Sequence, residues 1–232
     1  MSISVVASVG AGGTQYGVTS SSLDTTGADL LICVASWYYA VNSTDTMSDS
    51  KGNTWTALTL SGTTTSRCRI FYSTNSPTVG SGHTFTFSPG GSGAGYAIYP
   101  SINVLAVSGA HATSPFDQQN TNSGSGTSLS TGSVTPTENS ELLIAGIVRG
   151  QANSASIDGG FTISSQVNYN GGMNMGGALA YLIQSTAAAA NPSFSWISND
   201  SLSRTVIATF KAASPGGGGG SILPFMNFYL RV

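Results

Sequence analysis

Two short apolar segments dominate the pattern of this 232-residue sequence. The first covers residues 29–36 and the second residues 141–148, and each starts with an acidic side chain, Asp29 or Glu141, after a Ser/Thr-rich lead-in. Short apolar runs with branched residues and flanking turn formers are typical of strands that are buried on both faces or lie in a sandwich core. We therefore predict that these segments are the central strands of two related halves.

The features that follow the two segments come in the same order in each half. In the first half they are a turn, a strand with Trp55, a second strand, an alternation with Phe85 and Phe87 on one face, and a last apolar strand. They occupy residues 49–53, 54–60, 67–72, 83–88 and 102–107 in the first half, and residues 158–160, 161–163, 179–183, 192–197 and 204–210 in the second. Regular short strands separated by Gly- and Pro-rich turns favour a sandwich or a barrel.

The predicted fold class is an all-β, antiparallel β-sandwich with a jelly-roll-like arrangement. It is built from two pseudo-repeated halves, at about residues 14–110 and 127–213. One domain over residues 1–214 is favoured, because no clear linker divides the halves. The Ser/Gly-rich composition of residues 123–131 leaves two domains as the alternative.

The C-terminal end differs from the rest of the chain. Residues 215–221 are mostly glycine and predict a flexible linker, and residues 222–232 are strongly apolar. Such a segment would expose a large apolar surface if it were left in solvent, so we expect it to dock on another copy or on a partner subunit. Folding back as an edge strand of its own sandwich stays open. The docking side chains would be Ile222, Leu223, Phe225, Met226, Phe228, Tyr229 and Leu230.

The composition argues against several classes of protein. Only 7% of the residues are charged while 40% are apolar, which indicates a folded β-rich protein with hydroxyls and amides on its surface rather than a disordered chain. A net charge of −2 and the absence of a basic patch argue against nucleic-acid binding. Nothing reaches the roughly 18 apolar residues of a membrane span, and the N-terminus lacks a signal-peptide pattern, so we expect synthesis and assembly in the cytoplasm.

Side chains suited to catalysis are few. The two histidines, His83 and His111, belong to no catalytic motif, and no His/Cys/carboxylate cluster has metal-ligand spacing. We therefore expect no enzyme, no cofactor and no metal. Cys33 and Cys68 lie in apolar, strand-like surroundings, which favours buried free thiols over a disulfide between neighbouring strands.

Aromatic side chains supply the best candidate for a ligand-binding surface. Trp37, Tyr39 and Trp55 could stack on sugar rings, but strand alternation favours core packing for part of this set. Oxygen ligands for calcium could come from Asp45, Asp49 and Asn53, although capping of the turn at residues 49–53 is favoured.

One resemblance follows from four stretches of the first half, and a weaker form of it extends into the second. They are Ala28-Asp29-Leu30-Leu31-Ile32, Asp49-Ser50-Lys51-Gly52-Asn53-Thr54-Trp55, Arg69-Ile70-Phe71-Tyr72, and Gly109 with Ser114-Pro115-Phe116-Asp117. This succession resembles the β-sandwich domains of phage virion and tail proteins and of some bacterial surface proteins. The resemblance implies a sandwich with an exterior, assembled or adhesive role, and it carries over no catalytic residue.

The expected function is that of a non-enzymatic virion structural protein, a phage tail, fibre or capsid-decoration subunit that acts by self-assembly or attachment. Its expected partners are other copies of itself or other virion subunits, with a host surface glycan as a further candidate. The alternative is a carbohydrate-binding or adhesion module of a cell-surface or secreted protein.

Overall fold

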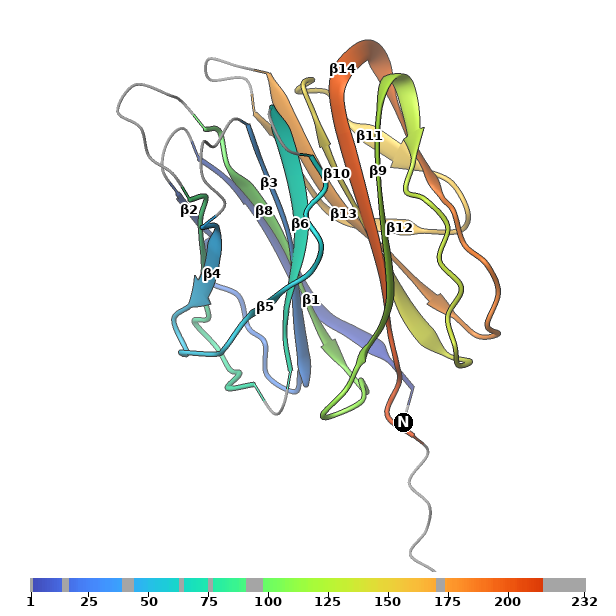
Figure 1. Cartoon of the computed structure of the whole chain (residues 1–232). Coiled ribbons are helices and arrows are strands. Elements are labelled where there is room, and N and C mark those ends of the chain that lie inside the picture. Colours follow the sequence, from blue (N-terminus) through green and yellow to red (C-terminus); the bar gives the residue numbers. More distant parts are fainter. Residues whose placement is uncertain are drawn as a thin grey trace, which may run out of the picture.

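All regular structure in the described part of the chain is β-strand. The computed structural model describes residues 2–13, 17–38, 44–62, 65–74, 77–90, 98–169 and 174–214. Within them the strands pair antiparallel in sheets that pack face to face, which confirms the predicted all-β antiparallel sandwich (Figure 1). No helix in this part of the chain has the length and apolarity to span a membrane. The tail, residues 215–232, lies outside the described residues.

The first half forms two sheets. A five-stranded sheet has the order β1-β8-β3-β6-β5, and a three-stranded sheet has the order β2-β7-β4. Their strands are β1 (Ser4–Gly12), β2 (Val18–Thr19), β3 (Leu30–Tyr38), β4 (Thr46–Asp49), β5 (Thr56–Ala57), β6 (Ser66–Ser73), β7 (Phe85–Ser88) and β8 (Ser101–Ser108). The strand predicted at residues 54–60 is shorter than expected, because beyond β5 only Leu58 and Ser61 continue the backbone bonding to β6.

The second half forms one six-stranded sheet. Its order is β11-β14-β10-β13-β12, and β9 pairs with β14 as well. The strands are β9 (Phe116–Ser130), β10 (Glu141–Arg149), β11 (Ala155–Ile157), β12 (Thr162–Tyr169), β13 (Met175–Gln184) and β14 (Ser193–Phe210).

The same pairing order underlies both halves. The order β1-β8-β3-β6-β5 of the first half corresponds to β9-β14-β10-β13-β12 of the second. The three-stranded sheet β2-β7-β4 corresponds to the end of β9, the start of β14 and β11, which pair at residues 128–130 and 193–196. In the second half, therefore, the long strand β9 takes the place of β1 and β2, and the long strand β14 takes the place of β7 and β8. The strands predicted at residues 192–197 and 204–210 are both parts of β14, and residues 123–131, considered as a linker, lie almost wholly in β9.

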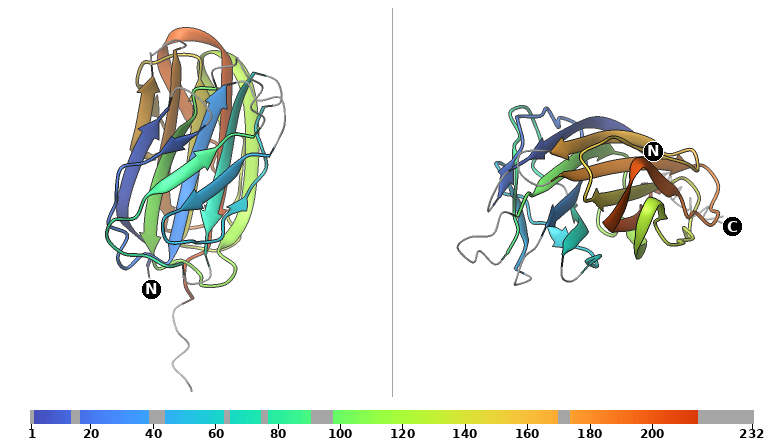
Figure 2. Two further views of the ribbon diagram at one scale, coloured as in Figure 1. Left: turned by 90° about the vertical axis from the view of Figure 1, so that its left-hand side faces the viewer. Right: turned by 90° about the horizontal axis from the view of Figure 1, so that it is seen from above.

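Three apolar clusters fill the spaces between the layers (Figures 1 and 2). Figure 1 shows the three-stranded sheet of the first half on the left, its five-stranded sheet beside it, and the six-stranded sheet of the second half on the right. Strand β3 is therefore buried on both faces: Leu30 and Ile32 face the second half, whereas Leu31 and Trp37 pack in the cluster with Phe87. This burial confirms the expectation for the first apolar segment, and β10 repeats it.

The central cluster, which joins the two halves, has two-fold character. Strand β3 contacts β10, β8 contacts β13 and β6 contacts β14. Exchanging each strand for its counterpart in the other half returns the same set of pairs, as at the isologous interface of a dimer. Val34 and Gly146 occupy equivalent positions in β3 and β10, and they meet here: a Cβ on Gly146 would lie 2.5 Å from Val34 Cγ1. Close contact of the two sheets thus needs a glycine opposite the valine.

The two cysteines occupy different faces of the five-stranded sheet. Cys33 belongs to the cluster between the two sheets of the first half and Cys68 to the central cluster, and both are free and buried. Burial raises the pKa of both thiols, because a thiolate would lose its hydration there. The structure therefore has the free thiols that the sequence favoured.

We predict that Gly146→Ala lowers the free energy of unfolding by about 1–3 kcal/mol, because the added methyl overpacks the contact with Val34. Val34→Ala should restore part of that loss in the double variant, although alone it opens a gap and destabilises. Urea unfolding of the wild type, both single variants and the double variant measures the coupling. Additive effects of the two substitutions would contradict the close contact.

Candidate functional site

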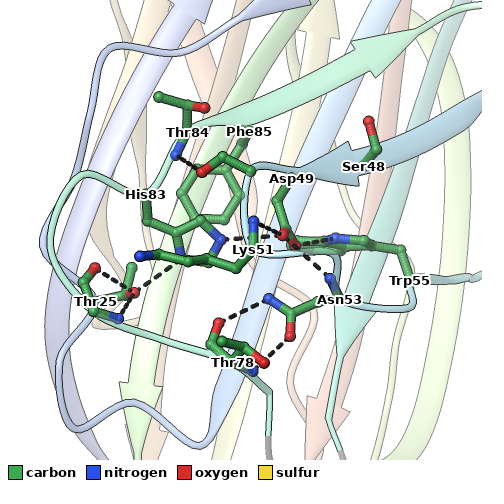
Figure 3. Close-up of polar contacts among 12 residues, drawn as sticks. Thr25, Ser48, Asp49, Lys51, Asn53, Trp55, Thr78, His83, Thr84 and Phe85 are labelled. Atoms are coloured by element: carbon green, nitrogen blue, oxygen red, sulfur yellow. Dashed lines mark hydrogen bonds and ion pairs between the residues drawn. The ribbon is translucent and has the colours of Figure 1, made fainter.

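The densest polar network of the first half lies at one corner, where the loop after β4 meets the turn before β7 (Figure 3). Asp49 is at its centre. Its Oδ1 accepts hydrogen bonds from the backbone N–H of Lys51 (2.8 Å) and of Asn53 (3.2 Å), and its Oδ2 accepts one from the indole N–H of Trp55 (2.7 Å). Gly52 has a φ of 76°, which suits a residue without a side chain in a tight turn. Asp49 therefore caps this turn.

The three oxygen-bearing side chains weighed for calcium point to different partners. Asp45 Oδ2 lies 2.7 Å from Arg69 Nη1, and the amide of Asn53 exchanges hydrogen bonds with the backbone of Thr78. Asp49 is engaged in its turn. Across the described ranges, no group of three or more His, Cys, Asp and Glu side chains could hold a metal ion.

His83 extends the network into the core. Its Nδ1 lies 2.9 Å from Thr25 Oγ1, and its Nε2 lies 3.3 Å from Asp49 Oδ1, a contact that lacks the alignment of a hydrogen bond. The ring stacks on Phe85 with a centroid distance of 4.3 Å. Hydroxyl, imidazole and carboxylate thus stand in a row, which is the composition of a nucleophilic triad.

The burial of this row makes it structural. Thr25 and His83 are both 0% exposed, whereas a nucleophile has to reach its substrate. The Thr25 hydroxyl also bonds the backbone of Gly80, with 3.0 Å to its N–H and 3.2 Å to its carbonyl oxygen. The three side chains therefore tie the segment around Thr25, the loop after β4 and the turn before β7 together.

Protonation follows from the same burial. Loss of hydration lowers the pKa of His83, and the nearby carboxylate of Asp49 only partly opposes this. For Asp49, burial favours the neutral acid, but the bonds from Trp55, Asn53 and Lys51 outweigh it and hold the pKa of the carboxyl below its usual range. At neutral pH the corner therefore contains a neutral imidazole beside a carboxylate.

Of the aromatic residues proposed for glycan stacking, the two that the structure describes are buried or half-buried. Trp37 is 0% exposed, and its ring packs against Phe87 with a centroid distance of 5.0 Å. Trp55 is half-buried, meets Phe85 edge-on and donates to Asp49. Tyr39 lies outside the described residues, as do the seven docking side chains of the tail. Of the three aromatics, only Trp55 keeps a solvent-exposed edge in the described part of the chain.

The corresponding corner of the second half is built from other side chains. Phe161 precedes β12 as Trp55 precedes β5, and residues 189–192 precede β14 as residues 81–84 precede β7. Residues 189–192 include Ala190 and Pro192 but no histidine, whereas residues 81–84 include His83. A hollow of about 360 Å³ lies here. The sequence did not reveal it, because its wall comes from three separate segments.

A second titratable cluster lies where β10 begins. Glu141 is fully buried; its Oε1 accepts the backbone N–H of Glu138 at 3.0 Å. Burial first, and then the nearby carboxylate of Asp117, raise the pKa of Glu141, and Lys211 lies 3.6 Å from Asp117. The equivalent residue of the first half, Asp29, binds the N–H groups that follow β8. Both acids thus fasten the end of a neighbouring segment.

Comparisons with protein families, with characterised proteins and with solved structures find no match for this chain. By its fold, the chain is an antiparallel β-sandwich protein.

We predict that stability falls as the pH drops below about 6.5, the ordinary pKa of histidine. The folded pKa of His83 is the lower one, so below that pH the unfolded chain binds a proton that the folded chain excludes. Thermal unfolding at pH 5 to 8 measures this effect. The melting temperature should change less with pH in His83→Gln than in the wild type.

His111→Gln is the matched control, because this second histidine is not fully buried. It should keep the wild-type pH profile. A His83→Gln profile parallel to that of the wild type between pH 5 and pH 7 would contradict the neutral, buried imidazole.

Proposed function

We propose that this chain is a non-enzymatic virion structural protein, a phage tail, fibre or capsid-decoration subunit that acts by self-assembly or attachment. One observation carries the non-enzymatic part: the row Thr25–His83–Asp49, whose chemistry could serve catalysis, is sealed in the core and fastens loops. The resemblance of the first half to β-sandwich domains of virion and surface proteins supports the location.

The surface suits assembly. Seven basic and nine acidic residues give a net charge of −2, so copies of the chain repel one another weakly. Strands β4 and β11 are at the ends of their sheets' pairing order, so among the described residues one side of each has no paired strand. Beside β11, Ile197 is 85% exposed. An added strand could pair with such an edge and cover this side chain.

The apolar tail is the proposed occupant of such an edge on another subunit. Residues 215–221 can span roughly 23–25 Å when extended, enough to leave the parent sandwich. Each of the larger side chains of residues 222–232 contributes about 1.5–3 kcal/mol when it is buried, which together offsets the ordering of a flexible arm. Docking in cis would bury the same side chains, so the oligomeric state decides between the two.

We predict that the full chain forms oligomers and that a chain ending at Ser214 is a folded monomer, as measured by light scattering with circular dichroism. A variant whose residues 222–232 are replaced by an equally long Gly/Ser segment is the control for chain length and should also be monomeric. An assembly state unchanged by both variants would contradict the docking role of the tail. Capsid and tail genes beside the gene for this chain would support the virion location.

An adhesion module that binds carbohydrate is the second candidate. The observation that favours it is the hollow beside Phe161, whose counterpart in the first half is filled by the rings of His83 and Trp55.

A further inference from the structure

The two pseudo-equivalent corners of the molecule differ in one respect: the first is filled and the second is hollow. In the first, the imidazole of His83 and the indole of Trp55 pack against Phe85 with centroid distances of 4.3 and 6.0 Å. In the second, the smaller Phe161 replaces the tryptophan, and alanine and proline stand in the segment that holds the histidine. The missing rings leave a hollow of about 360 Å³, within the range of small-ligand sites.

The polar side chains of the hollow are the carboxylate of Asp158 and the amides of Gln184 and Asn191. Gln184 Oε1 is buried and has no hydrogen-bond partner among the described residues. Asp158 uses Oδ1 for the backbone N–H of Ser193, at 2.7 Å, and its second carboxylate oxygen is open to a ligand. A buried acceptor without a donor is costly, so a ligand that supplies O–H or N–H groups would gain from this site. No Lys or Arg lines it, which disfavours anions.

The rest of the wall is apolar. Phe161 and Pro192 are buried, and Leu182 is half-buried beside them. A pyranose ring matches such a mixed wall, because its hydroxyls lie around the rim and its C–H groups form an apolar face. A small ammonium ion would match Asp158 but would leave the apolar wall unused, and the exposed carboxylate would hold it weakly in water.

We propose that this hollow binds one sugar residue, with hydroxyls donating to Asp158 and Gln184 and the apolar face on Leu182 and Pro192. The inference stands on the hollow alone, and the assembly role does not depend on it. A single sugar residue binds with a Kd on the order of millimolar. Several copies in one assembly would raise the avidity for a glycan-coated surface.

The test is an NMR titration of the full ¹⁵N-labelled chain with methyl α-glucoside, galactose and N-acetylglucosamine. The amide chemical shifts are measured at each sugar concentration. At least one sugar should shift the amides of residues 158–161 and 189–193 with a Kd on the order of millimolar. Residues 83–85, where packed rings occupy the equivalent place, serve as an internal control and should not shift. Absence of shifts at the hollow with all three sugars would overturn the proposal, as would shifts with methylammonium alone.

Two variants localise the binding. Ala190→Leu fills the hollow and should raise the Kd about tenfold or more, whereas Ala188→Leu, an exposed neighbour outside the wall, should leave it unchanged. If Ala190→Leu does not fold, Asp158→Asn replaces it: it keeps an acceptor for Ser193 but loses the open carboxylate oxygen, and binding should weaken. Undiminished binding in the folded variant would overturn the assignment. Loss of sugar binding would not alter the oligomeric state.

Discussion

The rest of the structure depends on one contact. It joins the five-stranded sheet that contains β3 to the six-stranded sheet that contains β10. It gives both central strands a second buried face, and it fixes the halves in a two-fold-like arrangement around Val34 and Gly146. Each large side chain buried there contributes about 1.5–3 kcal/mol, whereas the same apolar face on an isolated half would be open to water. The outer sheets then only need to cover the remaining faces.

The two halves share their pairing but have diverged in the side chains that fill them. Trp37 in β3 and Arg149 in β10 occupy equivalent positions, and both are fully buried. The arginine bonds Asn153 at 3.2 Å and Asn168 at 3.3 Å, and burial lowers its pKa to about 10 against the opposing charge of Asp200. The same pairing order thus has an apolar end in one half and a polar end in the other. A repeated framework leaves surfaces free to differ.

Sequence patterns identified those parts of the fold that depend on local periodicity. The runs that became β3 and β10 and the alternation of Phe85 with Phe87 were predictable, because burial imposes their composition. Strand β9 was not, since its Ser-, Thr- and Gly-rich residues owe their order to pairing with β14 rather than to apolar burial. The row Thr25–His83–Asp49 joins side chains far apart in the chain, and no local spacing reveals it.

The two halves depend on each other through the apolar face they share. Expression of residues 1–114, which include every strand of the first half, tests it most directly. We expect this fragment to aggregate, or to form a dimer that buries the same face, as seen by sedimentation velocity with circular dichroism. A soluble monomer that unfolds cooperatively would contradict it and would make the halves two independent domains.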